Sequence, residues 1–253
     1  MPSQFDLTGS VAVVTGGSSG IGRRMAGALA EAGAAVALVA RSADKLEAVA
    51  SEIEAVGGRA FAVPADLMNR ESLPDVVSTV TTGLGAPTIL INAAGINLRE
   101  PWADVTMESW DRTLHLNLGV PFFLARACVP GMIEKGYGRI VNIASLQSYR
   151  AFANSMPYGA SKGGVVQLTR AMAEAWSKDG VTTNAIAPGF FPTELTAAVF
   201  DNPELAAHNA AMTAVGRNGE LDDLDGITVF LCSSASAYIT GQTIPVDGGF
   251  TAK

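Results

Sequence analysis

The sequence predicts an α/β fold in which a doubly wound, seven-stranded parallel sheet is flanked by helices. Short apolar runs alternate with helical segments along the chain, the pattern that parallel sheets produce. Of the 253 residues, 48% are hydrophobic and only 16% are charged, which is enough for a large buried core. Because no Pro/Ser-rich linker or charge run divides the chain, we expect residues 1–253 to form a single domain.

The predicted elements follow one another in strand–helix order. The apolar runs expected to form buried strands cover residues 11–14, 35–39, 59–64, 88–91, 140–144, 181–186 and 242–246. The segments expected to form helices cover residues 25–32, 42–56, 71–82, 109–132, 157–178 and 221–231. A Pro-, Phe- and Ala-rich excursion, residues 190–215, separates the sixth strand from the last helix and is typical of a substrate lid.

A glycine-rich turn, residues 15–22, connects the first strand to the first helix. Gly16 permits a tight turn, Gly20 lets backbone approach a pyrophosphate, and Gly22 allows the helix to pack closely on the sheet. The spacing is G-x-x-x-G-x-G rather than the commoner G-x-G-x-x-G. The strand–turn–helix setting nevertheless indicates a Rossmann-type dinucleotide site. Its expected contacts are Gly16, Ser18, Ser19, Gly20, Ile21 and Gly22.

The second predicted strand runs into Ala40-Arg41-Ser42, where a Rossmann-type site meets the adenosine ribose. An NAD site usually has Asp or Glu there. The guanidinium of Arg41 can instead bind a 2′-phosphate with its forked donors, and Ser42 lies beside it. The sequence therefore favours NADP(H) over NAD(H). Ser19, where a second basic residue would have reinforced this preference, adds no charge, and Arg41 as a solvated turn residue is the alternative.

Two further strand ends are candidate cofactor contacts. Asp66 and Leu67 follow the third strand, where Asp66 can meet the adenine or simply cap a helix. Small residues follow the fourth strand, where open α/β sheets bind ligands, and close packing is the alternative explanation. These residues are Asn92, Ala93, Ala94 and Gly95.

Tyr158 and Lys162 lie four residues apart in a predicted helix, so their side chains share one face. Such a pair alone usually marks a solvated helix surface. An ammonium about 4 Å from a phenol, in an effective dielectric of about 20, favours the phenolate by roughly 4 kcal/mol, or about three pKa units. We therefore expect the pKa of Tyr158 to lie near neutrality, where acid–base catalysis is most efficient. Ser145 directly follows the fifth predicted strand, and Asn117 lies in the helix of residues 109–132.

Charge and composition argue against several other classes of protein. The net charge is −7 with no visible basic patch, so nucleic-acid binding is not expected. Cys128 and Cys232 have no C-x-x-C spacing or neighbouring His, which predicts buried thiols in a reducing compartment and no metal site. Neither His115 nor His208 lies in a hydrolase motif. Residues 1–6 lack a signal-peptide pattern and no later apolar run is long enough to span a bilayer, so we expect a cytoplasmic protein without a membrane segment.

In their order and spacing these residues resemble the short-chain dehydrogenase/reductase family, in its single-domain branch. The resemblance covers nearly the whole chain. Ala93 stands where the family often has a second Asn. The matching motifs are Thr15-Gly16-x-x-x-Gly20-x-Gly22, Asn92-Ala93-Ala94-Gly95, Asn117, Ser145, Tyr158-x-x-x-Lys162, and Pro188-Gly189 with Thr193.

The resemblance implies a role for each matching position. Tyr158 would be the general acid in reduction and the base in oxidation, while Lys162 would lower its pKa and hold the nicotinamide ribose. Ser145 would bind the substrate carbonyl, and Asn117 would anchor a water relay towards Lys162. The bound nicotinamide would supply the hydride, leaving orientation and electrostatics to the protein. Further cofactor contacts would come from residues 186–189, including Pro188 and Gly189, from Phe191 and Thr193, and from Tyr158 and Lys162 themselves.

The loops after the fifth and sixth strands look most like those of gluconate 5-dehydrogenases and related sugar-acid or polyol oxidoreductases. Gln147, Arg150 and Phe190 are the expected substrate contacts, with Arg99 and Arg150 as candidate carboxylate ligands. Solvated loop residues are an equal alternative. A set of aromatic residues instead favours an apolar pocket and leaves open a 3-oxoacyl-thioester reductase or a general ketone reductase. These residues are Trp102, Phe152, Phe190, Phe191 and Phe200.

Two other functions use the same fold. A sugar-nucleotide epimerase can use the same Tyr and Lys, but such enzymes carry an added substrate domain. A non-catalytic NADPH-binding protein would not need the four catalytic-type residues together.

Family members are usually tetramers or dimers. Small residues on the far face of the Tyr158 helix would permit such contacts between subunits, namely Ala160, Gly164 and Ala171. We therefore expect a homotetramer, with a dimer as the alternative.

Overall fold

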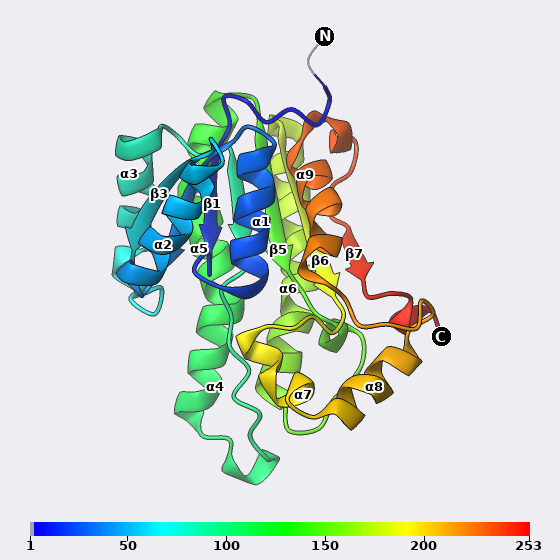
Figure 1. The fold of residues 1–253 in the computed structure, drawn as a ribbon. Coiled ribbons are helices and arrows are strands. Elements are labelled where there is room, and N and C mark those ends of the chain that lie inside the picture. The colour runs from blue at the N-terminus through cyan, green and yellow to red at the C-terminus, as the bar shows by residue number, and fades with distance from the viewer. Residues whose placement is uncertain (1–2) are drawn as a thin grey trace.

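The computed structural model describes residues 3–253, which are built around one parallel sheet in the order β3-β2-β1-β4-β5-β6-β7 (Figure 1). The predicted strands are confirmed to within two residues at either end. Most of their residues are buried, which explains why the sequence shows unbroken apolar runs instead of alternation. The strands are β1 (Val11–Thr15), β2 (Ala35–Ala40), β3 (Arg59–Pro64), β4 (Ile89–Asn92), β5 (Gly138–Ile143), β6 (Val181–Pro188) and β7 (Thr243–Val246).

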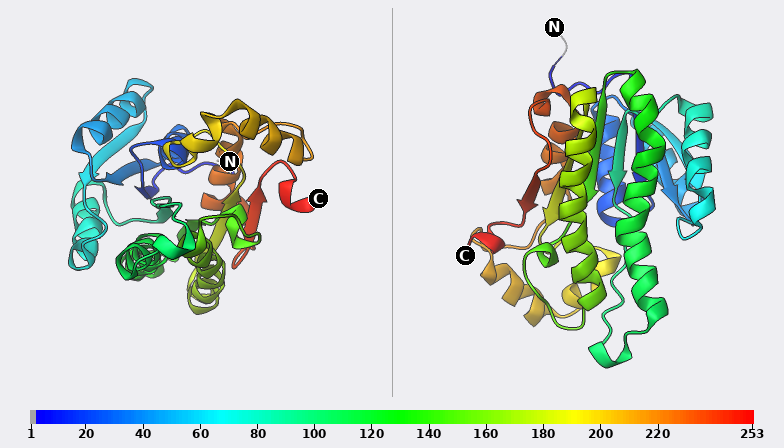
Figure 2. Two further views of the ribbon diagram at one scale, coloured as in Figure 1. Left: turned by 90° about the horizontal axis from the view of Figure 1, so that it is seen from below. Right: turned by 180° about the vertical axis from the view of Figure 1, so that it is seen from behind.

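Helices cover both faces of the sheet (Figure 2). One face is covered by α1 (Gly20–Glu31), α2 (Ala43–Ala55) and α9 (Asp225–Cys232), whose apolar side chains form one core cluster with the strands. The other face is covered by α3 (Leu73–Leu84), α5 (Val120–Glu134) and α6 (Met156–Trp176). The doubly wound α/β prediction is therefore confirmed. Helix α1 begins five residues earlier than predicted, because its first turn is made by the glycine motif, which carries no apolar periodicity.

The predicted helix of residues 109–132 is a longer rod with a defect in its middle. It comprises α4 (Met107–Leu114), a π-helical segment (His115–Gly119) and α5. By length and composition, Met107–Glu134 could cross a membrane, so the expectation that no segment is long enough was wrong. However, α5 packs its apolar face against the sheet and α3, through residues such as Leu124 and Met132, and core helices of globular proteins meet the same criteria.

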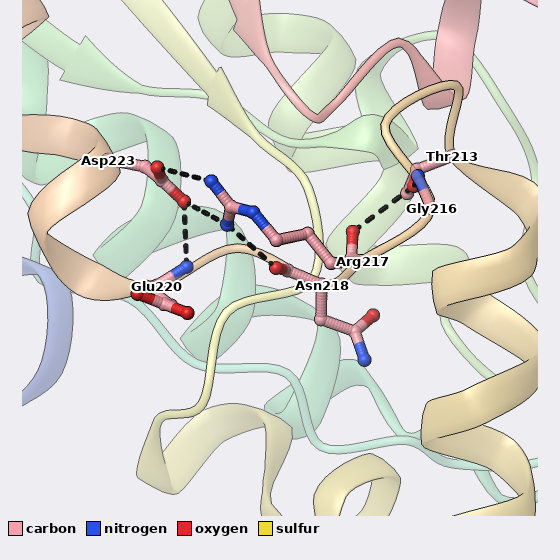
Figure 3. A network of polar contacts seen from close by, with 6 residues as sticks. All are labelled: Thr213, Gly216, Arg217, Asn218, Glu220 and Asp223. Atoms are coloured by element: carbon pink, nitrogen blue, oxygen red, sulfur yellow. Dashed lines mark hydrogen bonds and ion pairs between the residues drawn. The ribbon is translucent and has the colours of Figure 1, made fainter.

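The predicted lid region contains two short helices, α7 (Ala197–Phe200) and α8 (Pro203–Met212), which lie beyond the carboxyl ends of the strands (Figure 1). A polar network fixes the chain that follows them (Figure 3). The two Arg217 guanidinium nitrogens bind the Asp223 carboxylate at 2.6 and 2.8 Å, and the Thr213 hydroxyl donates to the Arg217 carbonyl. The hydrogen bond from Arg217 lowers the pKa of Asp223 to about 2, so this anchor is charged at all ordinary pH values.

Both cysteines are free and buried, as predicted. Burial raises the pKa of Cys128 and of Cys232 to about 12, which keeps both thiols protonated. Neither is therefore a reactive thiolate at neutral pH.

Candidate active site

A cavity of about 480 Å³ lies at the carboxyl ends of the central strands. It spans the point where the chain order in the sheet reverses, between β1 and β4, which is where open α/β sheets bind ligands. Most of the predicted site residues line it. They are Gly16, Ser19, Gly20, Ile21, Gly22, Arg41, Ala93, Ala94, Gly95, Ser145, Gln147, Tyr158, Lys162, Pro188, Gly189, Phe190, Phe191 and Thr193.

The glycine turn forms a cradle that no larger residue would allow. Gly16 has a φ of 69°, and a Cβ placed on it would lie 3.0 Å from the backbone nitrogen of Ala94. A Cβ on Gly22 would lie 2.4 Å from the Gly16 carbonyl oxygen. The absence of side chains leaves the start of α1 exposed to the cavity, so the turn fits the pyrophosphate of a dinucleotide.

Arg41 lines the same cavity at the end of β2, together with Ser19 of the glycine turn. This arrangement fits the 2′-phosphate of NADP(H), because a guanidinium and a hydroxyl are good donors to phosphate oxygens. Ser42 precedes α2 as its N-cap residue and does not line the cavity. Asp66 accepts a hydrogen bond at 3.0 Å from the Met68 backbone, which matches its alternative interpretation as a local cap.

Ser145 and Tyr158 both line the cavity, and they lie close enough for the Ser145 hydroxyl to lower the pKa of Tyr158. Ser145 follows β5 in an extended conformation, and its Oγ accepts from the Gln147 backbone at 3.1 Å. Tyr158 lies in the first turn of α6 and is buried. Two hydroxyls from different elements therefore converge on one point, as polarisation and protonation of a carbonyl oxygen require.

Lys162 lies one helical turn beyond Tyr158, with Nζ 5.6 Å from the centre of the tyrosine ring. Its ammonium donates to the Ile143 carbonyl at 2.6 Å, which fixes it beside the end of β5. Burial lowers the pKa of Lys162 to about 8, so it is mostly charged at neutral pH. Lys162 is therefore close enough to act on the phenol but does not hydrogen-bond to it.

The expected lowering of the Tyr158 pKa is not seen in the protein alone. Burial raises the pKa of Tyr158, and the Ser145 hydrogen bond and the Arg99 charge oppose this only in part. The sequence argument considered the cation and left out desolvation, which is a property of the folded site. Tyr158 is consequently protonated at neutral pH, the state that a proton donor needs.

Asn117 lies in the π-helical segment and does not line the cavity, but it hydrogen-bonds to residues of the segments that do. Its Nδ2 donates to the Ile96 carbonyl at 2.9 Å and to Ser161 Oγ at 3.0 Å, while its Oδ1 accepts from the Ile96 backbone at 2.9 Å. π-bulges of this kind often occur at functional sites. A Cβ on Gly95 would lie 3.1 Å from Asn117 Oδ1 and 3.8 Å from Lys162 Nζ, so the two residues share one small space. The water relay stays a prediction.

The cavity lining combines polar and aromatic side chains. Asn97, Arg99 and Gln147 line it together with Phe152 and Phe190, whose rings meet edge to face with centroids 6.1 Å apart. Arg99 adopts a φ of 55°, which is uncommon for a residue with a side chain. The charge of Arg99 acts on Tyr158 and Arg99 lines the same cavity, so it is placed to meet an anionic group beside Tyr158.

Several predicted contacts do not line the cavity. The Arg150 guanidinium instead lies over the Phe250 ring, 5.3 Å from its centre. Leu67 is buried in the core, and Asn92 is buried with its amide bonded to Asn142 at 2.8 Å. For these residues direct contact with a ligand stays a prediction. The full set is Ser18, Ser42, Asp66, Leu67, Asn92, Asn117 and Arg150.

Several lining residues escaped sequence reasoning. Among them, Ile96 and Asn97 extend the turn after β4, and Glu194 follows Thr193 at the start of the predicted lid region. Their position directly after a predicted strand-end motif was the available signal. Nothing in their residue type indicated a ligand.

Fold, cavity and paired hydroxyls define a Rossmann-type oxidoreductase site, and comparison with known proteins agrees. A family model described as enoyl-(acyl carrier protein) reductase matches residues 16–251. The chain belongs to the short-chain dehydrogenase/reductase family. Gluconate 5-dehydrogenase of Gluconobacter oxydans is 39% identical over 99% of this chain and 98% of its own. The 2-dehydro-3-deoxy-D-gluconate 5-dehydrogenase of Escherichia coli K12 is 37% identical over 99% of both chains.

A solved structure shows the same fold with a ligand-bound site. The gluconate 5-dehydrogenase of Burkholderia cenocepacia, crystallised with NADP and tartrate, superposes on this chain with a TM-score of 0.94. It is 36% identical, and the match covers 99% of this chain and 98% of that one.

Proposed function

We propose that the protein is an NADP(H)-dependent oxidoreductase that interconverts a ketone and a secondary alcohol on a sugar acid or polyol. The observation that carries the proposal is the Ser145–Tyr158 hydroxyl pair, placed in a cavity that also reaches the glycine turn and Arg41. When bound, the reduced cofactor supplies a hydride. Ser145 holds the carbonyl oxygen and Tyr158 donates its proton to that oxygen. Lys162 keeps a positive charge nearby.

The sugar-acid assignment is supported by polar side chains in the cavity lining and by the names of the relatives. Arg99, Asn97 and Gln147 offer a cation and amide groups that suit a carboxylate and hydroxyls. The names of the two curated relatives both describe oxidation at C5 of a gluconate-type sugar acid. An apolar ketone is a second candidate substrate, favoured by the aromatic side chains of Phe152, Phe190 and Phe191 in the cavity lining.

A carbonyl panel tests this assignment. Loss of reduced-nicotinamide absorbance is followed with NADPH and then NADH, using 5-keto-D-gluconate, a 3-oxoacyl thioester and simple aromatic ketones. We expect the highest kcat/KM with 5-keto-D-gluconate and NADPH. Higher values for the thioester or the aromatic ketones would assign one of the alternative reactions, and no turnover with any of them would favour a non-catalytic cofactor-binding protein.

Removal of the Arg41 guanidinium is expected to weaken NADPH selectively. Charge-assisted hydrogen bonds to phosphate contribute about 1.5–3 kcal/mol, so Arg41→Ala should raise the Kd for NADPH about 10- to 100-fold. The Kd for NADH should change less than about threefold, because its ribose carries no phosphate. Fluorescence titration measures both constants. Arg59→Ala is the matched control, because Arg59 lies at the amino end of β3 and does not line the cavity. Equal weakening of both cofactors by Arg41→Ala would contradict the assignment.

We further propose that the chain acts as one domain with residues 190–215 as a lid, and that it assembles as a homotetramer. Trp110, Phe123 and Ile133 leave exposed apolar surface on α4 and α5, and Ala160 and Ala171 are exposed on α6. Gly164 does not belong to this surface, since a Cβ there would meet Leu118 of the same chain at 2.9 Å.

Light scattering coupled to size exclusion should give the mass of four chains. Replacing exposed Phe123 with Glu is expected to shift the mass to two chains or one, because a charge would be buried at the contact. Glu at Tyr238, which is fully exposed elsewhere, should leave the mass unchanged. A wild-type mass of one chain would contradict the proposal. The cytoplasmic location stays a prediction that fits two buried, unpaired thiols.

A further inference from the structure

Glu194 ties the start of the lid to the cofactor half of the cavity. Its carboxylate lies 3.2 Å from Lys45 Nζ and accepts a hydrogen bond at 3.5 Å from Ser19 Oγ. Ser19 belongs to the glycine turn, and Lys45 lies in the first turn of α2, four residues after Arg41. Neighbouring Thr193 packs against the same turn, since a Cβ on Gly20 would lie 3.2 Å from its methyl group. The lid therefore closes onto the place where a 2′-phosphate would lie.

The charge of Glu194 is unfavourable for that phosphate. Among the described residues that line the cavity it is the only carboxylate, and it shares the cavity with Arg41 and Ser19. A carboxylate repels a phosphate dianion and at the same time occupies the ammonium of Lys45. A ribose with free hydroxyls meets no such repulsion, and its hydroxyls can donate to a carboxylate. Glu194 thus opposes the preference that Arg41 creates.

The Glu194–Lys45 ion pair is weak enough for a competing anion to replace Glu194. The side chains of Lys45 and Glu194 are 58% and 71% exposed, and ion pairs this exposed are weak. The other end of the lid is held by the two-pronged Arg217–Asp223 pair and the hydrogen bonds around it (Figure 3). A competing anion can therefore release the Glu194 end while the Arg217 end stays in place.

We propose that Glu194 is a coenzyme-specificity residue, whose carboxylate competes with the 2′-phosphate of NADP(H) for Lys45 and Ser19. In the NADP(H) complex the phosphate takes Lys45 as a second cation beside Arg41, and Glu194 moves away. In the NAD(H) complex the Glu194–Lys45 pair persists. This inference rests on the proposed NADP(H) dependence. Competition from Glu194 makes the preference for NADP(H) smaller than Arg41 and Lys45 alone would give.

Binding of two cofactor fragments tests the competition without turnover. Calorimetric titration with 2′,5′-ADP and with 5′-AMP compares wild type, Glu194→Gln, Lys45→Met and the double variant. Glu194→Gln should bind 2′,5′-ADP about three- to tenfold more tightly at low salt, and this gain should shrink at high salt. Lys45→Met should bind it about tenfold more weakly, and in that background Glu194→Gln should give less than half of its gain on the logarithmic scale. Affinity for 5′-AMP should change less than twofold in every variant.

Glu204→Gln on α8 removes an exposed lid charge without touching the cavity and is the matched control. Equal affinity of Glu194→Gln and wild type for 2′,5′-ADP, or an equal gain with Glu204→Gln, would overturn the proposed competition. Neither result would affect the NADP(H) assignment. Failure of wild type to prefer 2′,5′-ADP over 5′-AMP would overturn the NADP(H) assignment as well.

Discussion

Tyr158→Phe should lower kcat by about 10²- to 10⁴-fold while leaving the Kd for NADPH within about twofold of wild type. The substitution removes only the hydroxyl that lies beside Ser145 in the cavity, and the ring continues to fill its buried position at the start of α6. Steady-state reduction of 5-keto-D-gluconate gives kcat, and fluorescence titration gives the Kd.

Tyr149→Phe is the matched control, because this tyrosine is half exposed and lies outside the cavity. Its activity should equal that of wild type. A Tyr158→Phe protein with near-normal kcat would remove Tyr158 from the chemistry.

The pH profile of the wild type should depend on the reaction direction. Because burial raises the pKa of Tyr158, the donor form prevails at neutral pH, so the reduction rate should be flat there. The rate should fall first as Lys162 loses its charge above its pKa of about 8, and further when the pH rises above the pKa of Tyr158. The oxidation rate, which needs the phenolate, should rise over the same alkaline range. Oxidation that peaks below neutral pH would contradict the assignment of Tyr158 as the base.

Lys162→Met should lower the activity and at the same time raise the stability of the fold. Loss of the cation beside the developing charge is expected to lower kcat by about 10²- to 10³-fold. The free energy of unfolding at pH 7 should nevertheless increase by about 1–2 kcal/mol. The buried ammonium, with a pKa lowered to about 8 from 10.5, costs about 3 kcal/mol, and the unpaired Ile143 carbonyl left by the substitution takes back part of that gain.

The direction of this stability change follows from the protonation of Lys162 in the folded and unfolded chains. Below pH 8 Lys162 is charged in both folded and unfolded chains, so the wild type carries the full penalty of the buried charge. Between about pH 8 and 10.5 the unfolded chain binds more protons than the folded one, so wild-type stability rises with pH. The advantage of Lys162→Met should therefore disappear above about pH 10.5. Urea unfolding at pH 7 and at high pH measures it, with exposed Lys178→Met as the control; a less stable variant at pH 7 would contradict the burial argument.

The sheet and most of the site could be predicted from sequence because both depend on local patterns. Strands buried on both faces leave apolar runs, and Gly16 and Gly22 are required by close backbone contacts within one turn. The Tyr158–Lys162 pair is fixed by helical spacing alone.

Features that depend on tertiary contacts could not be predicted. The π-helical segment at Asn117 has no apolar signature, and the hydrogen bonds of Asn117 to the Ile96 backbone join residues from different elements. The direction of the Tyr158 pKa shift depends on burial, which helical spacing does not reveal. The Glu194–Lys45 pair joins residues 149 positions apart, and Gly164 faces Leu118 rather than the surface.

Deuterium transfer tests the central claim most directly, namely that the Ser145–Tyr158 pair protonates a carbonyl that receives hydride from the bound cofactor. Wild type is incubated with 5-keto-D-gluconate and NADPH carrying deuterium at both C4 positions, and the product is analysed by mass spectrometry. We predict one deuterium on the former carbonyl carbon with wild type and at most a trace with Tyr158→Phe, although both bind the cofactor. Product without deuterium, or equal labelling by the two proteins in a single short incubation, would contradict the account.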